Sequence, residues 1–223
     1  MSSKSAAPKK LPVAKIGLVL VVLVVGAVLL MKGVNFSALV TRGMDFIRNV
    51  GPVVFFLAMA VLPTLSVPIS LFTITAGEAF APQMGLGGVI AVALAVLAIN
   101  LALTYWVARY ALRPVLTRLL NRYGYKVPRV TKDNALAVTI VTRLAPGLPY
   151  SVQAYILGIA EVPFVTYMIV SWLAQSLWAV GFIVLGQGLL KGNFMVAAKG
   201  LGVIVVAAVA VHFLRKKFAK RES

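Results

Sequence analysis

The most informative segment of this chain is RLAPGLPYSVQAYILGIAEVPF, residues 143–164. It is strongly apolar, yet only seventeen residues separate its two charged residues, Arg143 and Glu161. A helix that crosses a membrane needs roughly 20 apolar residues. Pro146 and Pro149, with a glycine between them, also interrupt the beginning of the stretch. The segment is therefore too short and too broken to cross a membrane as one straight helix.

The composition of the whole chain indicates a membrane protein. Of the 223 residues, 61% are hydrophobic and 12% are charged, whereas a soluble domain has roughly 45–50% apolar and about 25% charged residues. Lipid must therefore cover much of the surface. With no cysteine and a single histidine, His212, the chain cannot build a thiolate or histidine metal cluster. We expect no metal and no cofactor.

The apolar runs predict an all-α polytopic protein with four full transmembrane helices and two re-entrant helical hairpins. A first broken run, between Asn49 and Gly77, is uncharged but contains Pro52, Pro63 and Pro68, and its longest proline-free piece is too short to span. The broken runs predict hairpins at 50–82 and 135–163, within a membrane domain at 50–190. The full spans are predicted at 16–31, 79–108, about 164–187 and 196–214. The first of these could instead be a secretory signal, but no clear cleavage site follows it.

The distribution of basic residues predicts the orientation. The formal net charge is +17, and 16 of the 22 Lys and Arg residues fall in the tail 1–15, the central segment 109–133 and the tail 215–223. Basic residues beside apolar runs mark the cytoplasmic side. Both termini and the central segment are therefore expected in the cytoplasm, and the two hairpins must enter from opposite faces. We expect the bacterial inner membrane, with an organellar membrane left open, and no nucleic-acid binding.

The central segment contains two pairs of arginines with helical spacing. Arg109 and Arg113 form one i,i+4 pair, and Arg118 and Arg122 form the other. Like charges at this spacing are mildly unfavourable on a helix. Anionic lipid headgroups would offset that repulsion and favour a helix lying on the membrane surface. A solvated cytoplasmic loop is the alternative.

The two hairpins also form an internal repeat. A shift of 81 residues superimposes residues 68–82 on 149–163 with five identities in fifteen positions. Because the matched segments are predicted on opposite faces, the repeat is inverted, and paired interruptions of this kind point to a transport site near the membrane midplane. The residues that we interpret as hairpin breakers are Pro63, Pro68, Gly77, Pro146, Pro149 and Gly158.

Broken backbone at membrane depth requires polar partners, so the two breaks predict a polar cavity between the hairpins. Ionisable residues within membrane segments are functional candidates. We expect Arg143 to bind an anionic headgroup, with Glu78 and Glu161 balancing that charge or titrating during transport. The alternative is that all three are interfacial residues that fix hairpin depth. Asn100, an amide within an apolar run, is expected to bond a neighbouring helix or to contact cargo.

The residues 143–164 resemble the signature of the DedA superfamily, which is also called the VTT-domain or SNARE-associated Golgi protein family. PTLSVPISLFTITAG, residues 63–77, is similar to the matching first hairpin. The resemblance covers roughly residues 50–190 and implies re-entrant hairpins and lipid handling. Arg143 matches the first arginine of the family motif. Pro149 occupies the place of a second arginine found in many bacterial members, so the chain is closer to the Golgi-type branch.

These observations favour a flippase- or scramblase-like transporter of lipid or lipid-linked anionic cargo. Membrane lipids with anionic headgroups are the expected partners, and a homo-oligomer is possible. A proton- or ion-coupled transporter of a small solute and a non-transporting membrane organiser are the alternatives. The chain has no nucleotide-binding loop, and His212 lies too near the C-terminus for a Ser-His-Asp arrangement. Glu78 and Glu161 as an acid–base pair are the remaining enzymatic possibility, and we expect no enzyme.

Overall fold

The computed structural model describes residues 36–123, 129–145 and 148–219. The chain divides into two compact units, Met1–Phe46 and Ile47–Ser223. In the first unit, only the beginning of helix α2 (Phe36–Val61) is described. The predicted transmembrane helix at 16–31 and the basic tail 1–15 lie outside the described residues. The descriptions below concern the second unit.

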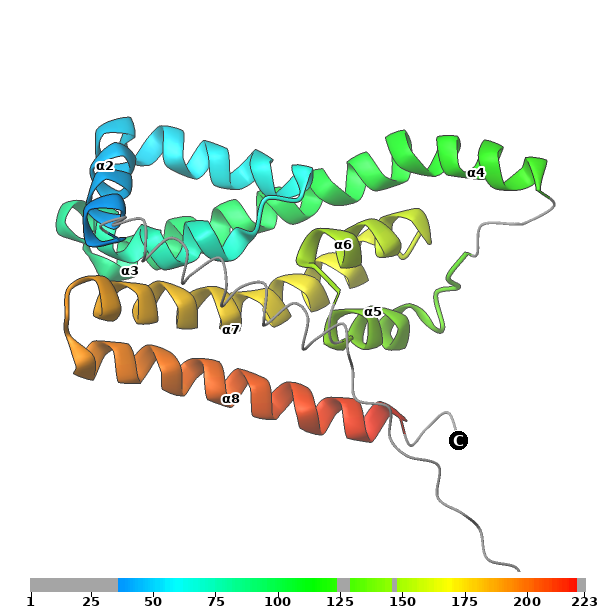
Figure 1. Cartoon of the computed structure of the whole chain (residues 1–223). Helices are drawn as coiled ribbons and strands as arrows, with labels where there is room; N and C mark the ends of the chain where they lie inside the picture. Colours follow the sequence, from blue (N-terminus) through cyan, green and yellow to red (C-terminus); the bar gives the residue numbers. More distant parts are fainter. Residues whose placement is uncertain (1–35, 124–128, 146–147, 220–223) are drawn as a thin grey trace, which may run out of the picture. The chain divides into compact units, whose positions relative to one another are not determined.

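The first predicted hairpin is a pair of helical arms that turn back at a break (Figure 1). Helix α2 is interrupted at Gly51, whose φ is 80°, and its second part continues into a 3₁₀ turn at Leu62–Leu65. Ser66 then adopts a left-handed conformation, with φ at 72°. After Pro68, helix α3 (Ile69–Trp106) begins, and it is interrupted at Gly85. The arms of this first hairpin are therefore residues 52–65 and 69–84.

The second hairpin consists of two shorter helices, α5 (Ala135–Leu144) and α6 (Tyr150–Ile159). Pro149 immediately precedes α6, just as Pro68 immediately precedes α3, and both prolines have extended backbone. Because proline cannot donate a backbone hydrogen bond, it is well placed at the start of a helix, where that donor has no partner. The repeat predicted from the sequence thus has matching helix starts in the structure.

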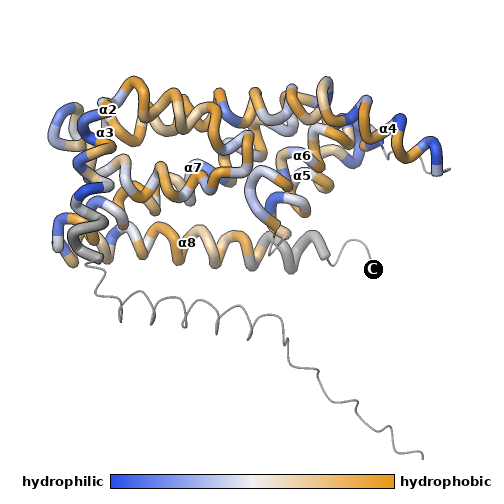
Figure 2. Tube along the Cα trace, turned by 45° about the horizontal axis from the view of Figure 1, so that its top comes forward, coloured by the Kyte–Doolittle hydropathy of each residue, from blue (hydrophilic) through white to orange (hydrophobic). Residues whose placement is uncertain are grey.

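Long helices follow each hairpin. After Gly85, α3 continues through a π-helical segment at Val107–Leu112 into α4 (Arg113–Arg122), and α7 (Phe164–Leu190) is joined by a short turn to α8 (Phe194–Ala219). Four helical stretches among the described residues are long and apolar enough to cross a membrane: Thr41–Leu65, Ile69–Arg122, Phe164–Leu190 and Phe194–Val211. The apolar colouring along α8 and the hydrophilic end of α4 are visible in Figure 2. The predicted all-helical membrane fold is confirmed.

The core between α3, α6 and α7 is built around two buried tyrosines. The rings of Tyr105 and Tyr167 lie 4.8 Å apart, and neither side chain is exposed. The Tyr105 hydroxyl donates to the carbonyl of Val162 at 2.6 Å, and the Tyr167 hydroxyl donates to the carbonyl of Leu101 at 3.0 Å. A buried hydroxyl without a partner would be costly, and here each hydroxyl bonds a carbonyl of another segment. Each tyrosine therefore links two segments and also fills volume in the core.

Two of the predicted hairpin breakers do not break a helix. Gly77 lies inside α3 and Gly158 inside α6, and neither has a positive φ. Both are points of close helix contact: a Cβ at Gly77 would lie 2.5 Å from the carbonyl oxygen of Ile183, and a Cβ at Gly158 would lie 2.6 Å from the Cβ of Ala108. These glycines therefore permit packing of each hairpin against a long helix of the other repeat. The helix also passes through Pro82, and the chain reverses at Gly85 instead.

Candidate transport site

A polar cavity lies between the broken ends of the two hairpins. Its volume is about 390 Å³. The first hairpin contributes the residues around its break, the second hairpin contributes Arg143 and the start of α6, and α7 contributes a third side. The lining residues are Ser66, Val67, Pro68, Ile69, Ser70, Arg143, Leu148, Pro149, Tyr150, Ser151, Gln153, Gln175, Trp178 and Phe182.

The two breaks also contact each other directly. The hydroxyl oxygens of Ser151 and Ser66 lie 3.4 Å apart, and the Tyr155 hydroxyl donates to the carbonyl of Thr64. These contacts join segments that are 85 or more residues apart in sequence. Broken backbone is tolerated at membrane depth where protein groups or a polar cavity supply partners. The predicted cavity between the hairpins is therefore a feature of the structure, with Pro68 and Pro149 on its wall.

Arg143, at the end of α5, is the charged residue of this cavity. Arg143 is only 8% exposed. Its Nε donates to the Ser171 hydroxyl at 2.8 Å, its Nη1 lies 3.5 Å from the carbonyl of Tyr150, and its guanidinium lies 5.4 Å from the ring centres of Tyr150 and Tyr167. Its Nη2 is buried without a hydrogen-bond partner among the described residues. This unpartnered donor fits an anionic oxygen.

The cavity lies near the middle of α7. Gln175, Trp178 and Phe182 line it, and they surround the midpoint of the 27-residue helix Phe164–Leu190. At a rise of about 1.5 Å per residue, α7 is roughly 40 Å long, which is enough to cross a hydrocarbon core of about 30 Å. A helix that crosses the membrane would therefore hold this cavity close to the midplane.

A second, apolar groove meets the polar cavity at Arg143 and Trp178. Its volume is about 340 Å³, and it runs between α5, α7 and α8. Apart from Arg143, its lining residues are apolar: Ile140, Leu144, Val170, Leu173, Ala174, Leu177, Trp178, Ala207, Ala210 and Val211. Arg143 thus belongs to the wall of both spaces, one polar and one apolar. This arrangement suits a ligand with a charged end and a hydrocarbon chain.

The two predicted carboxylates lie at opposite ends of α7, away from Arg143. Glu78 pairs with Arg48 at 2.7 Å and lies 3.8 Å from the Nζ of Lys191, beyond the C-terminal end of α7. Glu161 precedes the N-terminal end of α7 and pairs with other arginines. Among the described residues, neither carboxylate forms a hydrogen bond or an ion pair with Arg143. The structure therefore does not bring these three residues together, and the titration of either glutamate stays a prediction.

Asn100 links three helical segments. Its amide nitrogen donates to the carbonyl of Ala60 at 2.8 Å and lies 3.3 Å from the Thr64 hydroxyl, while its oxygen accepts from the Tyr150 hydroxyl at 2.9 Å. The residue is fully buried. It therefore holds both hairpins to α3, which is the helix-bonding role expected of an amide in an apolar run. Through Tyr150 it also supports one wall of the cavity.

We predict that replacing Asn100 by alanine destabilises the protein. The change leaves the Ala60 carbonyl and the Tyr150 hydroxyl without partners, and each unmet buried group costs about 1–3 kcal/mol. Asn121→Ala is the matched control, because Asn121 is exposed on α4. Thermal unfolding of the purified protein in detergent should show a lower midpoint for Asn100→Ala than for Asn121→Ala. Equal midpoints would show that the buried amide contributes nothing.

The four arginines of the predicted surface segment divide into two groups. Arg118 and Arg122 are exposed on α4, as expected for a surface helix. Arg113 is buried and pairs with Glu161, and Arg109 donates to the hydroxyl of Tyr105. Arg113 therefore holds the end of α6, whereas Arg109 bonds a residue one turn earlier on its own helix. The partners of Arg113 lie far along the chain, so helical spacing alone did not indicate its role.

Several residues of the cavity were not identified from the sequence. Tyr150, Gln153, Ser171 and Gln175 either line the cavity or hold Arg143. Gln153 donates to the carbonyl of Leu148 at 3.1 Å, and its amide oxygen is buried without a partner among the described residues. Uncharged amides within apolar runs were the available signal, as they were for Asn100. Pro146 lies outside the described residues, and Pro63 lies within the 3₁₀ turn before the first break.

The long apolar helices define an integral membrane protein, and its interrupted helices border a cavity lined by Arg143 and several uncharged polar residues. The family model of the VTT domain matches residues 67–188, which is just over half of the chain and runs from the end of the first break through the whole second hairpin. The chain therefore belongs to the VTT-domain family, and the predicted resemblance to the DedA superfamily is supported at that level. No curated protein and no solved structure matches it.

Proposed function

We propose that this protein moves lipids, or lipid-linked anionic molecules, between the two leaflets of a membrane without altering them chemically. The observation that carries the proposal is the position of Arg143. This residue lines both a polar cavity and an apolar groove, and its buried Nη2 has no hydrogen-bond partner among the described residues. A phosphate oxygen would supply the missing acceptor, because arginine donors match phosphate geometry well.

The shape of the two spaces favours an amphipathic cargo over a small polar solute. The polar side offers hydroxyl and amide groups, such as those of Ser151, Gln153 and Gln175, to a headgroup. The groove between α5, α7 and α8 offers hydrocarbon to a chain. A small solute would have no use for the groove, whereas a lipid would occupy both spaces at once. The headgroup would then cross between the two hairpins while its chains stay in an apolar environment.

The orientation and the branch of the family are part of the same proposal. Basic segments beside apolar runs favour cytoplasmic termini, and a bacterial inner membrane fits this pattern. With that orientation, the two hairpins are re-entrant from opposite faces, as in transporters built from inverted repeats. Proline at position 149 favours the Golgi-type branch of the superfamily. We propose no enzymatic activity.

Reconstitution of the full chain in proteoliposomes tests the proposed function. The probe is a phospholipid with a fluorophore on one acyl chain, and a membrane-impermeant quencher reports its appearance in the outer leaflet. We expect translocation of the probe at a rate well above that of protein-free vesicles, with no ion gradient applied. Protein-free vesicles and vesicles with an unrelated helical membrane protein are the controls.

Each alternative function has its own outcome in this assay. Probe movement that requires a pH or Na⁺ gradient would contradict simple scrambling and favour coupled transport. Vesicles that accumulate a small solute but leave the lipid probe in place would overturn the lipid proposal in favour of a solute transporter. An absence of flux for every substrate tested would favour a non-transporting organiser.

A further inference from the structure

A further cavity, distinct from both spaces at Arg143, is lined by four arginines. Its volume is about 490 Å³. Arg109, Arg113, Arg118 and Arg129 line it together with a single carboxylate, Glu161. It shares no lining residue with the cavity that contains Arg143. Its ligand can therefore be considered independently of the proposed transport function.

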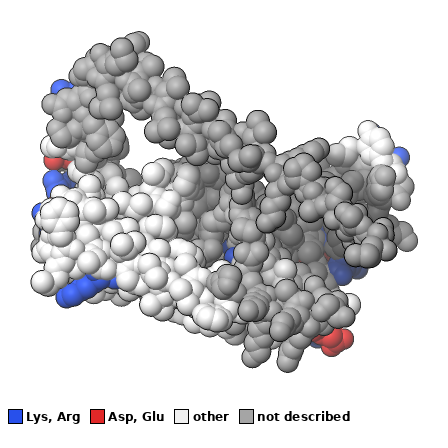
Figure 3. Space-filling view, turned by 60° about the horizontal axis from the view of Figure 1, so that its bottom comes forward, with Lys and Arg blue, Asp and Glu red and all other residues white. Residues whose placement is uncertain are grey.

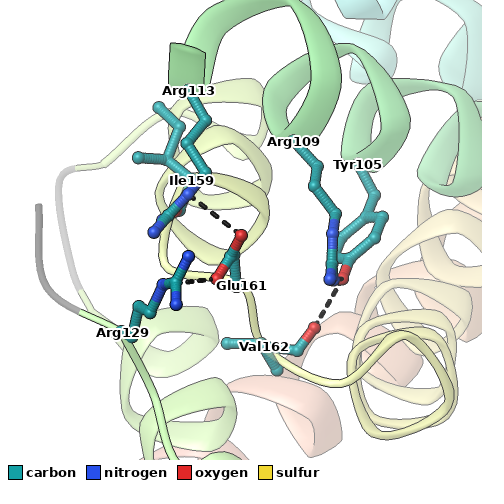
Figure 4. Close-up of polar contacts among 7 residues, drawn as sticks. All are labelled: Tyr105, Arg109, Arg113, Arg129, Ile159, Glu161 and Val162. Atoms are coloured by element: carbon teal, nitrogen blue, oxygen red, sulfur yellow. Dashed lines mark hydrogen bonds and ion pairs between the residues drawn. The ribbon is translucent and has the colours of Figure 1, made fainter. Parts of the chain in front are cut away.

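Glu161 organises the centre of this arginine cluster (Figure 4). One of its carboxylate oxygens lies 3.1 Å from the Nε of Arg113, and the other lies 2.8 Å from the Nε of Arg129. Arg113, which is 9% exposed, also donates to the carbonyl of Ile159. The φ of Glu161 is 57°, a conformation that costs a non-glycine residue about 1 kcal/mol or more. The two ion pairs hold the carboxylate of Glu161 between Arg113 and Arg129.

The cluster has more positive charge than Glu161 can balance. Arg109 donates a hydrogen bond to a neutral group, the hydroxyl of Tyr105. Arg118 is exposed and has no recorded ion pair among the described residues. Guanidinium groups around one cavity repel one another. A bound anion would offset it, and arginine forks are well suited to phosphate oxygens.

The surroundings of the cavity indicate that the anion belongs to a lipid. The rings of Trp106 and Tyr110 stack at 5.2 Å, and both residues are exposed. Val115 and Leu119 are likewise exposed on α4. Exposed aromatic rings beside arginines are typical of the membrane–water interface, and a helix with apolar and basic residues suits the headgroup region. On the face shown in Figure 3, the described surface is largely uncharged, with Lys and Arg mostly at its margins.

We propose that the cavity lined by Arg109, Arg113, Arg118 and Arg129 binds the phosphate group of an anionic membrane lipid at the membrane surface. The lipid phosphate sits opposite Glu161 and is held by the arginine donors that Glu161 leaves unused. Bound there, it joins α4 to the segment that precedes α5 and to the end of α6. This lipid is a resident of the surface site and is not the cargo of the central cavity.

The test is a titration of the purified full-length protein in a neutral detergent. Short-chain phosphatidic acid is added, and the apparent dissociation constant is obtained from the shift of the thermal unfolding midpoint. We expect the midpoint to rise with phosphatidic acid and Arg118→Ala to weaken the binding by roughly tenfold, because one charged hydrogen-bond donor is lost. Arg122→Ala is the matched control: Arg122 is exposed on the same helix but does not line the cavity. Its effect should stay below about twofold.

Three outcomes would overturn the proposal. Equal weakening by Arg118→Ala and Arg122→Ala would mean that the lipid responds to diffuse surface charge. The same midpoint shift with short-chain phosphatidylcholine would mean that the anionic headgroup is not recognised. Saturation by inorganic phosphate at the concentrations at which phosphatidic acid saturates would assign the site to a soluble phosphate. Lipid translocation is not measured in this experiment, so its result does not depend on the proposed transport function.

Discussion

Arg143→Ala is expected to reduce lipid translocation in proteoliposomes by at least roughly tenfold, because a hydrogen bond to a charged partner contributes about 1.5–3 kcal/mol. The proposed role of Arg143 is to bind the headgroup through its unpartnered Nη2 while Ser171 and two tyrosine rings fix its position. Alanine removes both the charge and the donors. The measurement is the rate at which the probe becomes accessible to the quencher in the outer leaflet.

Arg143→Lys separates the charge from the geometry of the guanidinium group. Lysine keeps a positive charge but lacks the planar fork that bonds Ser171 and faces the rings of Tyr150 and Tyr167. We therefore expect a translocation rate between those of the wild type and the alanine variant. Arg122→Ala serves as the control for the loss of an arginine elsewhere, since Arg122 does not line either space at Arg143.

The stability of each Arg143 variant must be measured alongside its activity. A buried arginine that contacts two aromatic rings also contributes to packing, so a loss of flux is informative only if the variant remains folded. Size-exclusion profiles and unfolding midpoints close to those of the wild type provide that control. A folded Arg143→Ala protein that translocates the probe at the wild-type rate would show that headgroup binding does not involve this residue.

The sequence predicted the interruptions of the apolar runs and the cavity between them because the evidence for both is local. Prolines in apolar runs mark the places where a membrane helix stops, and Pro68 and Pro149 do precede the second arm of each hairpin. An arginine beside such a break is conspicuous in an apolar run, so Arg143 was identified as well. The need of broken backbone for polar partners then predicted a cavity between the breaks. All of these inferences use residue types and positions along the chain.

Features that depend on distant contacts could not be predicted in this way. Glycine permits both a positive φ and close helix packing, and one sequence does not distinguish them; Gly77 and Gly158 proved to serve packing. Proline can remain within a membrane helix when neighbours supply the missing contacts, so Pro82 did not mark the reversal. Glu78 pairs with Arg48 and Lys191, which lie 30 and 113 residues away in sequence. Nothing in the sequence near Glu78 indicated these partners.

Gly186→Ala is expected to be among the most destabilising single substitutions. Gly186 lies in α7, where a Cβ would come within 2.0 Å of the carbonyl oxygen of Ile74 and 2.7 Å of its carbonyl carbon. Backbone atoms cannot move aside as a flexible side chain can, so α3 and α7 would have to separate along their contact. Overpacking of this kind costs about 3 kcal/mol, which corresponds to a midpoint roughly 6–12 °C lower. Thermal unfolding in detergent measures the effect.

Gly87→Ala is the matched control, because no atom lies within 4 Å of a Cβ at that position in α3. Alanine stabilises a helix more than glycine does, by about 1 kcal/mol or less. The thermal unfolding midpoint should therefore stay the same or rise. Gly158→Ala provides a further test, since its nearest contact is the Cβ of Ala108. Ala108→Gly should partly restore the stability of Gly158→Ala and should not restore that of Gly186→Ala, where the contact is backbone. A Gly186→Ala protein as stable as Gly87→Ala would mean that α3 and α7 do not pack at this distance.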